Sequence, residues 1–99
     1  MDLKTACERS GGFMCNGACI LGANKITEIE PGRYLIDSPH GTFKVRSSTV
    51  RLSAHGMLFP FSNCALEVTR EKIIIECYVP VKDEKGNVHF EEEFSAVIY

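Results

Sequence analysis

Two alternating runs of apolar and polar residues, joined by a short polar segment, occupy the last third of this 99-residue chain. Every second residue of the first run is apolar; these residues are Ile73, Ile75, Cys77, Val79 and Val81. Because successive side chains of an extended chain point to opposite sides, this run predicts a half-buried β-strand. Its β-branched residues also suit a strand better than a helix.

The polar segment, residues 83–87, contains a glycine and predicts a turn. The second run repeats the alternation, with an apolar face made of Val88, Phe90, Phe94, Ala96 and Ile98. Glu92 interrupts this face, which indicates a β-bulge, the mouth of a barrel or an acid with a functional role. Pro80 has no backbone N–H to donate, so the first strand is expected to be an edge strand or to be bulged nearby. We expect this hairpin to form the main core, through Ile73, Ile75, Val79, Phe90, Phe94 and Ile98.

The rest of the chain contains further hairpin signals. Asn16 and Gly17 lie between two apolar runs, and this pair is typical of the type I′ turn that joins two antiparallel strands. Shorter strands are predicted at residues 25–30, 33–37, 42–46, 49–52 and 64–69. Residues 2–9 are compatible with one or two helical turns, with Asp2 as the N-cap. The sequence therefore predicts one all-β domain over residues 1–99, an antiparallel β-sandwich or small barrel built from consecutive hairpins.

Length and charge narrow the function classes. A chain of this size buries about 65% of its unfolded surface, enough for a core without a compulsory metal or disulfide. The net charge of −2 argues against a protein that binds the nucleic-acid backbone. Residues 1–63 contain seven Lys and Arg and five Asp and Glu, a balance of +2, whereas residues 64–99 contain four and eight, a balance of −4. This asymmetry is compatible with head-to-tail self-association or a charged partner, although in a small domain two differently charged solvent-exposed faces are the commoner explanation.

The apolar runs and the cysteines bear on the compartment. No run approaches the roughly 18 apolar residues of a membrane span, so no membrane partner is expected. The first residues lack the basic-then-apolar order of a secretory signal, which predicts a cytoplasmic location. The five cysteines are odd in number and widely spaced, which is not typical of a disulfide framework and agrees with a reducing compartment.

A zinc site is one alternative function. Cys15 and Cys19 have the spacing of paired zinc thiolates, and the remaining ligands would come from Cys7, Cys64, Cys77 or a histidine. The predicted hairpin opposes this site, because it places Cys15 across from Ala18 and Cys19 across from Met14, on opposite faces. Cysteine as a small buried apolar residue is the commoner role. We therefore predict no metal and no cofactor, with Cys15 and Cys19 as the ligands of the alternative.

Catalysis is the second alternative. A nucleophilic thiol at Cys15 or Cys19 requires an electropositive setting, and the neighbouring residues provide none. The run Glu91, Glu92 and Glu93 lacks a second inward acid, so it is interpreted as a charged strand edge that discourages pairing. Lys44, Arg46, Arg51 and Arg33 form a basic strip on the face opposite the aromatic Phe43, which again disfavours nucleic-acid binding.

The segment Met57–Phe61 carries the strongest functional signal. It contains four large apolar residues and a proline that makes a regular central strand unfavourable. An apolar segment that cannot pair fully is a candidate contact with another chain, and burial in the same domain is the competing explanation. We therefore predict a protein-binding or assembly module without its own catalysis, whose partner is a protein or a second copy of this chain. The predicted partner-binding residues are Met57, Leu58, Phe59 and Phe61.

Overall fold

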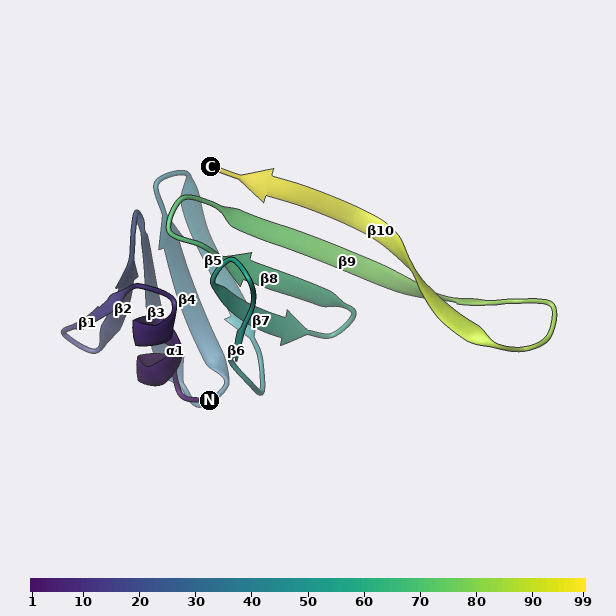
Figure 1. Cartoon of the computed structure of the whole chain (residues 1–99), viewed down its shortest axis with the longest axis horizontal. Coiled ribbons are helices and arrows are strands. Elements are labelled where there is room, and N and C mark those ends of the chain that lie inside the picture. The colour runs from purple at the N-terminus through teal and green to yellow at the C-terminus, as the bar shows by residue number, and fades with distance from the viewer.

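The computed structural model describes residues 1–99 and shows one short helix followed by ten antiparallel strands in two five-stranded sheets (Figure 1). The elements are α1 (Leu3–Arg9), β1 (Phe13–Cys15), β2 (Ala18–Leu21), β3 (Asn24–Glu30), β4 (Arg33–Ser38), β5 (Gly41–Arg46), β6 (Arg51–Leu52), β7 (Met57–Phe61), β8 (Cys64–Val68), β9 (Ile73–Lys82) and β10 (Val88–Ile98). Each strand pairs with its neighbours in the sequence, in the orders β1-β2-β3-β4-β5 and β10-β9-β8-β7-β6. The predicted all-β fold of consecutive hairpins is confirmed.

The β1–β2 hairpin turns at Asn16 and Gly17, as predicted. Both residues have positive φ, 50° and 82°, which is the backbone conformation of a type I′ turn. Cys15 pairs with Ala18, and Met14 pairs with Cys19. Cys15 and Cys19 therefore lie on opposite faces of the hairpin, as the sequence pattern predicted.

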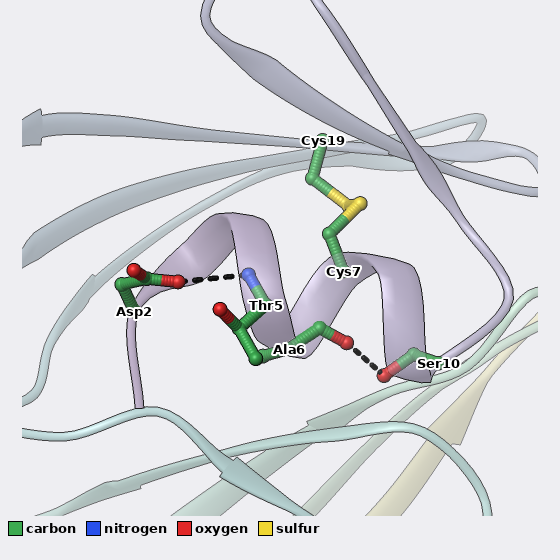
Figure 2. The surroundings of a disulfide bond; sticks show 6 residues. All are labelled: Asp2, Thr5, Ala6, Cys7, Ser10 and Cys19. Carbon is green, nitrogen blue, oxygen red and sulfur yellow. Dashed lines mark hydrogen bonds between the residues drawn. A yellow bond between two sulfur atoms is a disulfide. The ribbon is translucent and has the colours of Figure 1, made fainter.

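Helix α1 is capped at both ends and attached to the first sheet. The carboxylate of Asp2 accepts a hydrogen bond from the Thr5 N–H at 2.8 Å, and this bond holds the pKa of Asp2 below its usual value. A disulfide joins Cys7 of the helix to Cys19 of β2 (Figure 2). A helix of seven residues is too short to be stable alone, so its packing on the sheet maintains it. No helix in the chain has the length and apolarity to cross a bilayer.

The helix and both sheets contribute to one core. Its buried side chains are Leu3, Ala6, Cys7, Cys19, Leu21, Ile26, Tyr34, Ile36, Val45, Val50, Met57, Phe59, Leu66, Val68 and Ile73. The Tyr34 and Phe59 rings meet across the two sheets with their centroids 5.0 Å apart. Burial of the Tyr34 hydroxyl, followed by the charge of Glu28, raises the pKa of Tyr34.

The two sheets are also joined through their loops. The Ala23 N–H donates to the Arg70 carbonyl at 3.2 Å, and the Asn24 side-chain amide donates to the Thr69 carbonyl at 2.7 Å. Gly22 has a φ of +59° and lies so close to the Arg70 backbone that a Cβ atom would collide with it. A glycine is required there, because both the conformation and the close approach exclude a side chain.

Pro60 lies in a regular strand, contrary to the expectation that it would prevent one. The partner of β7 on one side, β6, is only two residues long and pairs with Met57 and Leu58 alone. Pro60 is therefore beyond the end of β6, where no strand needs its missing N–H. Its carbonyl accepts a hydrogen bond from the Ser47 hydroxyl at 2.7 Å.

The β9–β10 hairpin is much longer than the strands beside it. Strand β8 pairs with β9 only over residues 73–77, so residues 78–93 extend past the rest of the second sheet. We call this extension the arm (Figure 1). It gives the molecule extents of 52 × 26 × 22 Å. Pro80 lies in the arm, where β9 has β10 on one side only, which confirms the prediction of an edge at this proline.

The predicted bulge is also present. Phe94 pairs with Cys77 but Glu92 pairs with Tyr78, so β10 contains one extra residue, Glu93. Beyond the bulge the alternation of β10 is reversed relative to β9. Phe90 therefore pairs with Pro80 and lies on the face opposite that of Phe94.

The prediction that this hairpin forms the main core is wrong for its aromatic residues. Ile73 is fully buried, and Ile75 and Ile98 are half-buried against the core. Phe90 and Phe94, however, have 64% and 53% of their surface exposed. Alternation did not give the faces of the whole hairpin, because the bulge puts Phe90 on the face opposite Phe94. In addition, the first sheet does not extend far enough to cover the arm (Figure 1). Val79, also in the arm, is only half-buried.

Candidate interaction surface

Strand β10 carries most of the exposed large apolar side chains of the chain. Nine such side chains are exposed, and five of them lie on β10 or directly after it: Val88, Phe90, Phe94, Val97 and Tyr99. Isolated exposed apolar residues are ordinary on protein surfaces, but a concentration on one strand is a candidate interaction surface. Phe94 lies on the face opposite that of Val88, Phe90 and Val97, because the bulge at Glu93 reverses the alternation.

The backbone of β10 is also free on one side. This strand is the edge of its sheet and is eleven residues long. An edge strand leaves a row of N–H and C=O groups without partners in the sheet, and such an edge can pair with a strand from another chain. The arm thus combines apolar side chains with a hydrogen-bonding edge.

A shallow cavity of about 430 Å³ lies where the arm leaves the sheet. It is lined by Ser62, Asn63, Cys64, Ala65, Tyr78 and Phe90. The Tyr78 N–H donates to the Asn63 carbonyl at 2.8 Å, which fixes β9 at this point. The Tyr78 hydroxyl donates to Glu76 at 2.8 Å, and this bond raises the pKa of Tyr78. Phe90 forms one wall of the cavity because the bulge turns its ring to the face of Tyr78.

The arm is acidic along its edge strand. Glu91, Glu92 and Glu93 are all exposed, and the sole ion-pair contact among them is a 2.9 Å approach of His89 to Glu91. Three carboxylates outnumber the single histidine beside them, so this edge carries a net negative charge. The charged edge that was predicted to discourage pairing is therefore next to exposed phenylalanines.

The predicted partner-binding residues lie in a different part of the second sheet. Met57 and Phe59 are fully buried in the core of this chain, and Leu58 and Phe61 are half-buried. Burial in the same domain therefore accounts for the apolar character of Met57 and Phe59. A binding role for Leu58 and Phe61 stays a prediction.

The expectation that the cysteines do not form a disulfide framework is wrong. Cys7 is bonded to Cys19 and Cys64 to Cys77, which leaves Cys15 exposed with a free thiol. The second pair follows from the register of the β8–β9 hairpin, which places Cys64 directly opposite Cys77. Wide spacing in the sequence is thus compatible with a disulfide when strand pairing brings the residues together.

These bonds also bear on the alternative functions. Cys19 is buried in a disulfide, so it is neither a free nucleophile nor a thiolate ligand in this state. No group of three or more His, Cys, Asp or Glu side chains is arranged to hold a metal ion. Three of the four predicted basic residues, Arg33, Lys44 and Arg46, border one pocket, whereas Arg51 lies on β6 in the other sheet. Arg33 also contacts Glu30 at 2.6 Å.

The sequence analysis did not identify Phe90 and Phe94 as surface residues. Their exposure could have been inferred from strand length. The last two strands, β9 and β10, have ten and eleven residues, whereas β7 and β8 have five each. A hairpin that is longer than its neighbours cannot be covered along its whole length by a sheet of ordinary strands.

Comparisons with known proteins did not identify a related protein. No protein-family model matches the sequence, and neither a curated protein nor a solved structure matches the chain.

Proposed function

We propose that this protein is a protein-binding assembly module without its own catalysis, and that a second copy of the chain binds to its arm. The observation that carries the proposal is the position of Phe90 and Phe94, two phenylalanines more than half exposed on a long edge strand. The acidic balance of residues 64–99 and the basic balance of residues 1–63 favour contact between copies, since unlike charges attract across an interface.

The energies support a reversible association. Full burial of a phenylalanine contributes roughly 1.5–3 kcal/mol relative to exposure. Because 64% of Phe90 and 53% of Phe94 is exposed in the single chain, their burial together would contribute about 2–3.5 kcal/mol. Strand pairing adds backbone hydrogen bonds of about 0.5–1.5 kcal/mol each. The loss of translational and rotational freedom on association opposes both contributions. The module is therefore expected to assemble in a concentration-dependent manner.

The two disulfides bear on the predicted cellular location of the protein. The cytoplasmic prediction drew support from cysteines that were expected to be reduced, and the two disulfides remove that support. Disulfides persist mainly in oxidising environments. We propose that the module works in such an environment, where Cys7–Cys19 and Cys64–Cys77 stay intact.

Replacing Phe90 and Phe94 by serine should weaken self-association without unfolding the chain. Wild-type protein is expected to show a sedimentation coefficient that rises with concentration. The F90S/F94S variant should associate at least about 20-fold more weakly than the wild type, which corresponds to the loss of about 2 kcal/mol. Because both rings are more than half exposed, the circular dichroism of the monomer should be unchanged.

The matched control is Phe13→Ser, which removes a third phenylalanine with 60% of its surface exposed, on β1 and away from the arm. F13S should associate like the wild type. A wild-type chain that remains monomeric at its highest soluble concentration would refute the proposal. Unchanged association of F90S/F94S would also refute it.

A further inference from the structure

We infer that the arm of one copy adds β10 to the free edge of β5 in the next copy, which gives a head-to-tail assembly. This inference rests on the proposed function and specifies which surface the arm recognises. It follows from comparing the free strand edges of the two sheets.

Four strands end the two sheets: β1, β5, β6 and β10. Strand β6 has only two residues and β1 only three, and β1 contains no charged residue. Strand β5 has six residues, Gly41–Arg46. It is the only free edge other than β10 that is long enough for several strand-to-strand hydrogen bonds.

The β5 edge carries charge opposite to that of the arm. Lys44 and Arg46 are exposed on one face of β5, and neither forms an ion pair within the chain. Glu92 and Glu93 of β10 are also without an ion pair. Opposite charges on paired strands stabilise the pairing. The cations of β5 would therefore form ion pairs with the carboxylates of β10.

An apolar receiving surface lies beside the basic edge. A pocket of about 390 Å³ is bordered by Ile29, Arg33, Lys44 and Arg46, among others. Ile29, the last residue but one of β3, has 58% of its surface exposed. This surface provides an apolar contact for one of the two phenylalanines, since Phe90 and Phe94 lie on opposite faces of β10. The cations beside it would meet the carboxylates of the incoming strand.

Symmetric pairings are disfavoured by charge. Pairing β10 with β10 of a second copy would bring two sets of Glu91, Glu92 and Glu93 together along one ladder. Pairing β5 with β5 would do the same for Lys44 and Arg46. Like charges opposite one another destabilise strand pairs. The head-to-tail arrangement avoids both repulsions, and such contacts repeat to form a closed ring or an open chain.

Charge reversal on either edge tests the inference. The edge variant K44E/R46E and the arm variant E91K/E93K should each weaken self-association at least about tenfold in sedimentation velocity at low salt. Matched controls make the same change in net charge elsewhere. K4E/K25E is the control for the edge variant, and E8K/E71K is the control for the arm variant. All four control positions are exposed, and both controls should associate like the wild type.

Mixing the two defective variants should restore assembly. The Lys arm of E91K/E93K would meet the Glu edge of K44E/R46E, and the remaining arm and edge would keep their natural charges. An equimolar mixture should therefore associate within about threefold of the wild type. Raising the salt concentration should weaken both the wild type and the mixture, because exposed charges are screened.

The outcomes separate this inference from the proposed function. Full association of K44E/R46E alone would overturn the head-to-tail pairing and favour contact between two arms, and the proposed function would stand. A mixture that stays monomeric would also overturn the pairing. Loss of association in F90S/F94S together with normal association in K44E/R46E would show that the arm binds a surface other than β5.

Discussion

Replacing Phe59 by alanine should lower the free energy of unfolding by about 3–5 kcal/mol, whereas replacing Phe94 should lower it by less than about 1 kcal/mol. Phe59 is fully buried and contacts the Tyr34 ring across the two sheets, so its removal leaves a cavity in the shared core. Phe94 has 53% of its surface exposed at the base of the arm. The measurement is denaturant unfolding followed by circular dichroism, at concentrations where the chain is monomeric.

The comparison decides where the core lies. From the sequence alone, Phe94 was expected to be a core residue and Phe59 a contact residue, and the structure exchanges their roles. A larger loss of stability for F94A than for F59A would contradict the structure and restore the earlier assignment. A loss of several kcal/mol represents much of the total stability of a domain of this size.

Replacing Cys7 and Cys19 together by alanine should lower the free energy of unfolding by about 2–5 kcal/mol. The disulfide closes a loop with a sequence separation of 12 residues and holds α1 against the first sheet (Figure 2). Without it, a seven-residue helix has only packing contacts to keep it in place. Denaturant unfolding under non-reducing conditions measures the loss.

Cys15→Ala is the control, because Cys15 is exposed and has no disulfide partner. Its effect should lie within about 0.5 kcal/mol of the wild type, as for most surface substitutions. A C7A/C19A variant that is as stable as C15A would contradict the structural role of the disulfide. Loss of the signal of α1 without global unfolding would show that the bond stabilises the helix alone.

The local features of the fold could be predicted from the sequence because they depend on nearby residues. The Asn16–Gly17 pair determined its turn through positive φ, and alternation gave the faces of β1 and β2. The interruption at Glu92 indicated the bulge, which the pairing of Glu92 and Phe94 confirms. Pro80 indicated an edge, and β9 has one in the arm.

The features that depend on distant parts of the chain could not be predicted. Alternation shows that Phe94 shares a face with Ala96 and Ile98. It does not show whether a second sheet covers that face. Pro60 is tolerated in β7 because β6 is short, and the length of β6 is not evident from residues 57–61. The bond between Cys64 and Cys77 depends on the register of two strands. Burial of Met57 and Phe59 in the core of this chain could not be predicted for the same reason, since it requires the first sheet.

The central claim is that the edge of β10 is the contact between copies, and amide hydrogen exchange at several protein concentrations tests it most directly. In the monomer, outward-facing amides of the β10 edge strand exchange quickly, because no strand pairs with them. As the concentration rises, we expect protection to appear in residues 88–93 of β10 and in residues 42–46 of β5. Exchange in residues 13–15 of β1, another free edge, should not change. Exchange in residues 88–93 that stays equally fast at every concentration, while the sedimentation coefficient rises, would contradict the claim.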